Sequence, residues 1–310
     1  MAQRSEPNFD AVTALSLGAR DHQEDAVVAD FPLGGDLGLI VLSDGMGGHA
    51  AGDVASKIVM TEVFSELKLQ ASNPETLRRG LPELLLGAAT AANDCIRAHI
   101  MENPDAEGMG ATLIAAVMNR GRLNWISIGD SPLFLYRDGT LSQLNEDHSM
   151  APQIDFMVET GLMDPETAVD HPDRNCLTSV LAGDEIAKID CPEQSFALRD
   201  GDIVIAASDG LQFLENWEIS KILKGRVEDP SKEIARHFLD ELERIDDPDQ
   251  DNVSIVVVKV SLPDADVHAL DATRVATRPL RDSAEAAAEG LFVRPRRVAP
   301  TRLVHAEARR

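Results

Sequence analysis

Residues 37–48 have the sequence LGLIVLSDGMGG. The first six are apolar residues and glycine, and a short apolar run that ends at a turn signal predicts a buried strand. The glycines that follow allow a sharp backbone turn, and beyond them Val54, Ala55 and Ile58 recur at helical spacing. This stretch therefore predicts a strand, a glycine turn and a helix, with Asp44 where the strand ends.

Short acidic motifs occupy similar positions along the whole chain. They are QED at 23–25, SDGMGG at 43–48, GDS at 129–131, SDG at 208–210 and DN at 251–252. Most adjoin an apolar, strand-like run, so we expect their carboxylates at strand ends. If they converge, they gather more negative charge than a protein holds together without cations. The motifs thus point to hard metal ions, which prefer oxygen ligands.

Each motif taken alone has a simpler interpretation. Asp44 can cap a helix from a glycine-rich turn, and Asp209 and Asp251 are of a residue type common in turns and caps. Glu24 and Asp25 are neighbours, which in a strand point to opposite faces. One of the two can therefore bind an ion directly and the other through a water, in either order.

The other segments predict an α+β protein with alternating blocks of sheet and helix. Strands are expected at 11–17, 112–118, 123–128, 133–136, from 141, at 203–207 and at 253–260, and helices at about 81–99 and within 215–245.

Residues 146–175 form a polar stretch that contains three prolines, and this predicts a mobile insertion or flap. His148 and His171 lie at its edges and are interpreted as capping or surface side chains, because the sequence identifies no partner for them. Beyond residue 262 the apolar period is lost, and Arg, Ala and Pro dominate a tail that we expect to be poorly ordered.

Composition narrows the function classes. The net charge is −24, which argues against nucleic acid as the main partner, because phosphate backbones bind basic surfaces. The tail differs from the rest, since residues 262–310 hold nine arginines against seven acidic residues.

Three cysteines without a CxxC pair suggest a reduced compartment. The sequence has no signal-peptide pattern and no long apolar run, so we expect a cytoplasmic protein without a membrane partner.

The ordered set of motifs resembles the metal-dependent protein phosphatases of the type 2C serine/threonine class, in their bacterial form. The motifs are RDHQED at 20–25, DGMGGHAAG at 44–52, GMGAT at 108–112, GDS at 129–131, LTSVLAG at 177–183, SDGL at 208–211 and DN at 251–252. The resemblance implies an α+β fold, in which a central antiparallel β-sandwich is flanked by helix pairs. The catalytic domain would span residues 8–262 with a flap subdomain at about 146–180, followed by a tail at 263–310.

The resemblance also implies the ligands of a binuclear Mn²⁺ or Mg²⁺ centre. Asp44 would bridge the two ions, with Glu24 and the Gly45 carbonyl on one of them. Asp209 and Asp251 would bind the other ion. Asp25 would act through a water, and Asp130 together with Asp209 would match a third-ion position. Arg20 would clamp the substrate phosphate, whose geometry suits a guanidinium fork.

A serine/threonine protein phosphatase follows as the leading hypothesis, with phosphomonoesters hydrolysed by water activated at the binuclear centre. Its partners would be proteins phosphorylated on Ser or Thr, which include regulators of the anti-sigma type, and the tail could dock on a partner or on the acidic body. A non-catalytic scaffold of the same fold that binds phosphoproteins is the alternative.

Three positions depart from the family pattern. Gln23 replaces a common Asn. Met46 stands where animal members carry a histidine suggested to protonate the leaving alcohol, so that proton would come from water at the metal centre. Pro132 stands where Arg is frequent, and nothing in the sequence explains this loss of charge.

Overall fold

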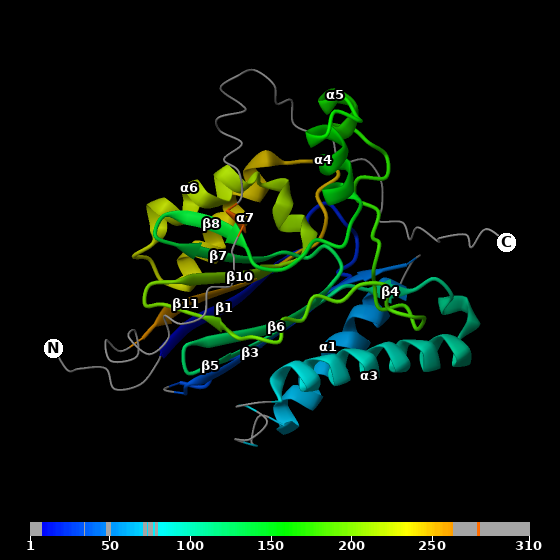
Figure 1. Cartoon of the computed structure of the whole chain (residues 1–310), viewed down its shortest axis with the longest axis horizontal. Helices are drawn as coiled ribbons and strands as arrows, with labels where there is room; N and C mark the ends of the chain where they lie inside the picture. Colours follow the sequence, from blue (N-terminus) through cyan, green and yellow to red (C-terminus); the bar gives the residue numbers. More distant parts are fainter. Residues whose placement is uncertain are drawn as a thin grey trace.

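Two antiparallel sheets stack face to face at the centre of the molecule, with helices on both outer sides (Figure 1). The computed structural model describes residues 8–33, 35–47, 51–70, 73, 77 and 80–262, and the backbone of 278–279. No helix within these ranges is long and apolar enough to cross a membrane.

The first sheet has the strand order β1-β11-β10-β7-β8-β12. Its strands are β1 (Asn8–Ser16), β7 (Leu133–Arg137), β8 (Thr140–Gln143), β10 (Ile203–Ala207), β11 (Val253–Ser261) and β12 (Arg278–Pro279). β12 is the described part of the tail, and it pairs with Gln143 and Ser142 at the sheet edge.

The second sheet has the order β2-β3-β5-β6-β9, with the short β4 paired to the end of β3. Its strands are β2 (Asp25–Asp30), β3 (Leu37–Met46), β4 (Gly110–Ala111), β5 (Leu113–Asn119), β6 (Arg122–Ile128) and β9 (Phe196–Ala197).

Side-chain alternation along the strands builds three apolar layers. In β3, Ile40 and Leu42 point into the space between the sheets, whereas Leu39 and Val41 pack against the helices. β11 alternates in the same way between the two sides of its sheet. Both sheets are therefore buried on two faces, which explains why their strands read as continuous apolar runs.

Two helices cover each sheet. α1 (Ala51–Gln70) and α3 (Leu81–Glu102) lie on the β2-β3-β5-β6 sheet, and α6 (Asn216–Arg226) and α7 (Ser231–Ile245) lie on the other (Figure 1). This arrangement confirms the predicted α-β-β-α layers.

The structure differs from several of the local predictions. β3 continues through Asp44 to Met46 instead of ending before it, because Gly45 and Met46 pair with Ala111 and Gly110. β2 was not predicted, since its apolar run is short and ends in acidic residues. The helical segment at 215–245 is two helices, because Pro230 lacks the N–H that a continuous helix needs.

The predicted flap contains two short helices, α4 (Ala151–Glu159) and α5 (Pro165–Val169), which project away from the sheets (Figure 1). The mobility of this segment stays a prediction. Apart from β12, the tail lies outside the described residues, and so does the expectation that it is poorly ordered.

Candidate metal centre

The pairing of β2 with β3 brings the first acidic motifs together. Asp25 and Asp44 are register partners across these strands, and Gly45 N donates to Glu24 O at 3.1 Å. The Asp44 backbone is held on its other side by Thr112, whose N–H donates to Asp44 O and whose hydroxyl accepts from Asp44 N. Glu24, Asp25 and Asp44 therefore share one end of the second sheet.

Close packing at Gly52 places the Glu24 carboxylate beside the Gly45 carbonyl. A Cβ built on Gly52 would lie 2.9 Å from Gly45 O and 3.1 Å from the Glu24 carboxylate carbon. Both oxygen-bearing groups thus face the same small volume, which only a residue without a side chain at 52 leaves open. This is the pair of groups that the resemblance assigns to one ion.

The second pair of carboxylates comes from the other sheet. Asp209 follows β10 and Asp251 precedes β11, and these strands are neighbours. A Cβ on Gly210 would meet Asn252 O at 2.0 Å, so the two segments touch. A hydrogen bond of 2.7 Å from Ser208 Oγ to Asp25 Oδ2 joins them to the first sheet.

Asp130 reaches the cluster from the turn between β6 and β7. Its neighbour Ser131 shares a hydrogen bond of 2.9 Å with Thr112, the residue that holds the Asp44 backbone. Asp130 is buried, and its charge acts on Asp44. The structure thus brings all the predicted carboxylates to one rim of the sandwich.

The crowding of negative charge changes the acidity of these groups. Burial first, and then the charges of Asp25, Asp209, Asp251 and Asp130, raise the pKa of Asp44 well above its usual range. Burial raises the pKa of Asp25 to about 7, although the hydrogen bond from the Ser208 hydroxyl lowers it. Burial also raises the pKa of Glu24. Cations would relieve this cost of keeping the carboxylates ionised.

Arg20 lies at the exposed edge of the cluster. Its Nη2 donates to Asp251 Oδ2 at 2.7 Å, and the two side chains are 42% and 31% exposed. Asp251 Oδ1 accepts a second hydrogen bond from the backbone N–H of Asn252. A cation is therefore already present beside the carboxylates, and it is the one predicted to bind phosphate.

The donor set fits divalent cations, although it does not enclose one as it stands. Among the described ranges, no three His, Cys, Asp or Glu side chains are grouped closely enough to hold an ion. The Gly45 carbonyl supplies one ligand that is not a side chain, and Arg20 holds Asp251. Asp25 Oδ1 is buried without a hydrogen-bond partner among the described residues, which fits a role behind a water ligand. Hard cations take carboxylates, backbone carbonyls and waters in such sites.

Three positioning residues escaped the sequence prediction. Asn252 Oδ1 accepts from Glu24 N and its Nδ2 donates to Leu17 O, which joins the two ligand segments. Ser208 and Thr112 hold Asp25 and Asp44 as described above. All three sit inside the quoted motifs or adjacent to them, but a sequence motif does not state which neighbour orients which carboxylate.

The profile of the family described as protein phosphatase 2C matches residues 18–249. These residues are most of the chain and include Glu24, Asp44 and Asp209. The chain belongs to the protein phosphatase 2C family.

Two curated relatives agree with this assignment. The serine/threonine protein phosphatase PstP of Mycobacterium tuberculosis is 34% identical over 244 residues, which cover 78% of this chain and 43% of PstP. This chain thus spans less than half the length of that relative. The serine/threonine phosphatase stp of Listeria welshimeri is 32% identical over 195 residues, which cover 61% of this chain and 72% of that protein.

Solved structures give the same result for the fold. The crystal structure of the M. tuberculosis phosphatase PstP/Ppp superposes with a TM-score of 0.68 at 32% identity, covering 82% of this chain and 99% of that one. A PstP catalytic-domain structure in complex with two manganese ions superposes with a TM-score of 0.67 at 30% identity. The predicted family and fold are confirmed.

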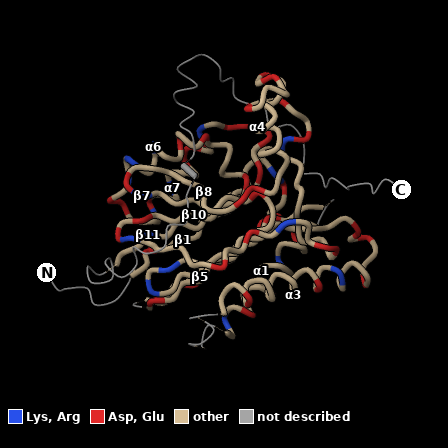
Figure 2. Tube along the Cα trace, in the orientation of Figure 1, with Lys and Arg blue, Asp and Glu red and all other residues tan. Residues whose placement is uncertain are grey.

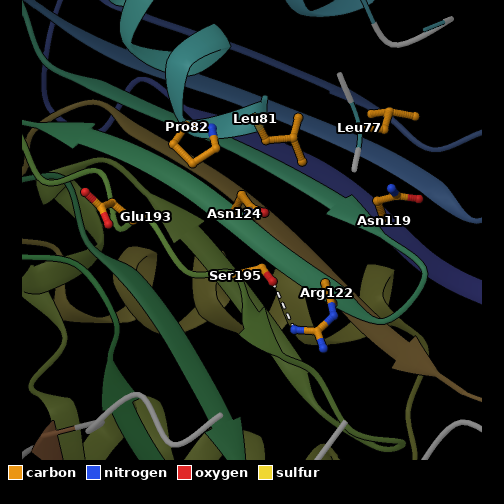
Figure 3. Close-up of a pocket in the computed structure, with 8 residues that line it drawn as sticks. All are labelled: Leu77, Leu81, Pro82, Asn119, Arg122, Asn124, Glu193 and Ser195. Atoms are coloured by element: carbon orange, nitrogen blue, oxygen red, sulfur yellow. Dashed lines mark hydrogen bonds between the residues drawn. The ribbon is translucent and has the colours of Figure 1, made fainter. Parts of the chain in front are cut away.

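This member of the protein phosphatase 2C family also has a polar pocket away from the acidic rim, with a volume of about 120 Å³ (Figure 3). Arg122 Nη1 donates there to Ser195 Oγ at 3.0 Å, and the buried Asn124 is another lining residue. Asn119, another lining residue, pairs with Leu37, seven residues along β3 from Asp44 and hence roughly 23 Å away. The pocket is therefore separate from the metal centre.

Proposed function

We propose that this chain is a metal-dependent phosphatase that hydrolyses phosphomonoesters on Ser and Thr residues of proteins. The observation that carries this proposal is the convergence of Glu24, Asp44, Asp209 and Asp251 at one rim with Arg20 beside them. A convergence of carboxylates alone would support a cation-binding protein. The adjacent guanidinium adds a group that suits the phosphate of a substrate.

The residues divide into a ligand set and a substrate group. Asp44 would contribute to both ions, Glu24 and the Gly45 carbonyl to one, and Asp209 and Asp251 to the other. Mn²⁺ or Mg²⁺ bound there would supply an acidified water as nucleophile and positive charge for the phosphoryl oxygens. Asp130 would hold a third ion.

Arg20 would orient the phosphoryl group. Its side chain is partly exposed and its contact with Asp251 is a single ion pair, so it can turn toward a phosphate at modest cost. A guanidinium fork can bind two phosphate oxygens at once.

Substrate proteins would approach across the flap. Phe156 and Leu162 of this segment are 62% and 77% exposed, which gives an apolar surface for an extended peptide to contact. The relatives named above are described as serine/threonine phosphatases, which supports a role in signalling by reversible phosphorylation. We further propose that the protein acts in the cytoplasm.

The tail would dock on an acidic surface. Acidic positions outnumber basic ones along the described trace (Figure 2), and the tail itself is rich in arginine. The pairing of Arg278 with Gln143 brings the tail back to the sheet edge. Removal of residues 263–310 should change partner capture more at low than at moderate salt, since screening weakens contacts between charges.

The test of the activity is phosphate release from a phosphothreonine peptide and from para-nitrophenyl phosphate with Mn²⁺. We expect turnover that EDTA abolishes and that Asp209→Ala lowers at least a hundredfold, because one ion then loses a ligand. Asp94→Ala, which removes an exposed carboxylate on α3, should leave turnover unchanged. A protein that binds the phosphopeptide with metal present and never releases phosphate would instead be a scaffold, and the proposal would fail.

A further inference from the structure

The flap joins the rest of the molecule through a short antiparallel neck. Ser149 and Leu177 form a β-bridge, and Met150 N donates to Cys176 O. Thr178 donates twice to His148 O, from its N–H and from its hydroxyl, at 2.7 Å each. The two ends of the flap are therefore held to each other at His148.

His148 also binds the turn that carries Asp130. Its backbone N–H donates to Gly129 O at 3.0 Å, and Gly129 N donates to His148 Nδ1 at 3.3 Å. Gly129 has a φ of +107°, and a Cβ there would meet the Thr112 side chain at 2.6 Å. A residue with a side chain therefore does not fit at position 129. His148 provides the hydrogen-bond partners of both the N–H and the C=O of Gly129.

The environment of His148 keeps the ring in the form that these contacts need. The side chain is buried, contrary to the expectation of a capping or surface histidine. Burial lowers the pKa of His148, and Glu146, Asp190, Lys188 and Asp147 are the charged groups that face it. A neutral imidazole can accept a hydrogen bond at Nδ1, whereas a charged one cannot.

We propose that His148 is a positioning residue that fixes the Gly129–Asp130 turn against the flap neck and thereby sets the affinity of the cation position at Asp130. The proposal deepens the proposed function, since it concerns the same metal centre. A second connection between the flap neck and the metal centre runs through Leu181 and Ala111 to Gly45. Its contacts are made by backbone groups, which a side-chain substitution does not remove. His148 supplies the side-chain contact that substitution can test.

Two substitutions separate the acceptor at Nδ1 from the bulk of the ring. His148→Leu fills the site with apolar atoms and leaves Gly129 N without its acceptor. His148→Asn places an amide oxygen near the position of Nδ1 and should restore the contact. His171→Leu is the matched control, because His171 Nδ1 accepts from Asp173 N within the flap and touches neither Gly129 nor Asp130.

The primary measurement is Mn²⁺ binding by calorimetry, with amide hydrogen exchange of Gly129 alongside. We expect His148→Leu to weaken the lowest-affinity Mn²⁺ site about fivefold, the size expected for one hydrogen bond, and to speed Gly129 exchange. His148→Asn and His171→Leu should stay within twofold of the unmodified protein. The effects of His148→Leu and Asp130→Asn should not add, since both act on one site.

Turnover of para-nitrophenyl phosphate supplies the second readout. His148→Leu should lower kcat in proportion to the lost Mn²⁺ occupancy, and raised Mn²⁺ should restore it, while KM changes little. A simple loss of folded protein would lower kcat at every Mn²⁺ concentration. Activity is not needed for the binding and exchange measurements, so a protein without phosphatase activity would refute the proposed function and leave this inference testable.

Several results would overturn the positioning role. One is unchanged Mn²⁺ affinity at every site in folded His148→Leu, and another is a His148→Asn protein as impaired as His148→Leu. If both variants fail to fold, exchange in the unmodified protein decides, because a Gly129 amide that exchanges as fast as an exposed amide has no acceptor at His148.

Discussion

Arg20 Nη2 and Asp251 Oδ2 lie 2.7 Å apart, so the residue predicted to bind the substrate phosphate is paired with a residue predicted to bind a metal ion. Both side chains are partly exposed, and such a pair contributes at most about 1 kcal/mol to stability. Its significance is chemical, because the N–H of Arg20 that contacts Asp251 is not available to a phosphate while the pair is formed.

Replacement of Arg20 should separate substrate binding from metal binding. Arg20→Ala is expected to lower kcat/KM about 10- to 100-fold. The kcat/KM of Arg20→Lys should lie between those of Arg20→Ala and the unmodified protein, since lysine keeps the charge and loses the fork. Mn²⁺ affinity should not fall, because Asp251 loses a competing cation. Steady-state kinetics and calorimetry check the two effects. Arg244→Ala, which breaks a surface pair with Glu241, is the control. Weaker Mn²⁺ binding in Arg20→Ala would contradict this view of the pair.

Gly52→Ala should damage the metal centre without unfolding α1. The added Cβ would stand about 3 Å from both Gly45 O and the Glu24 carboxylate carbon, the volume predicted for one ion. We expect Mn²⁺ affinity to fall at least tenfold in calorimetry. Gly87→Ala is the matched control, since a Cβ there meets nothing within 4 Å and should stabilise α3 by about 0.4–1 kcal/mol. Equal Mn²⁺ affinity in both variants would show that no ion binds between the Gly45 carbonyl and the Glu24 carboxylate.

The metal-free protein should lose stability as the pH rises from about 4 to about 7. Folding raises the pKa of Asp25 from 3.8 to about 7, so the folded state holds a proton that the unfolded chain has released in this window. Each unit of pKa shift corresponds to about 1.4 kcal/mol. Urea unfolding in EDTA should therefore show a lower midpoint at pH 7.5 than at pH 5.5.

Two comparisons isolate Asp25 in that experiment. Asp25→Asn should reduce the pH dependence without removing it, because Asp44 and Glu24, whose pKa values burial also raises, stay in both proteins. His148, whose pKa is lowered, acts in the opposite direction and also stays. Saturating Mn²⁺ should raise the midpoint most at pH 7.5, because bound ions need ionised carboxylates. A metal-free protein that loses no stability relative to Asp25→Asn over this range would show that Asp25 is ionised throughout.

Ser208→Ala should lower the free energy of unfolding by more than the loss of one small hydroxyl group suggests. Ser208 Oγ donates to Asp25 Oδ2 and accepts from Ser254 N, so its removal leaves two buried groups without their partner. We expect a loss of about 1–3 kcal/mol in urea unfolding and weaker Mn²⁺ binding through Asp25. Ser195→Ala, at a partly buried serine in the separate pocket, should cost under about 0.5 kcal/mol. Equal costs for the two variants would show that Ser208 does not support Asp25.

The local pattern of the sequence predicted most of the strands that carry acidic motifs, since buried runs such as Ile203–Ala207 and Val253–Ser261 are mainly apolar on both faces of their sheet. The turns at Arg120-Gly121 and Asp138-Gly139 adopt the positive φ values that hairpins of two residues require. β2 was missed because its pairing with β3, and not its own composition, makes it a strand.

The chain by itself determined which residues could bind cations and phosphate, because carboxylates, glycines and arginine have fixed chemistry wherever they stand. Only the tertiary structure decided how they meet. The Arg20–Asp251 pair, the Gly45–Gly52 contact, and the burial of His148 against Gly129 join segments separated by as many as 231 residues. The sequence pattern within a single segment does not predict such contacts, because they depend on how the two sheets stack.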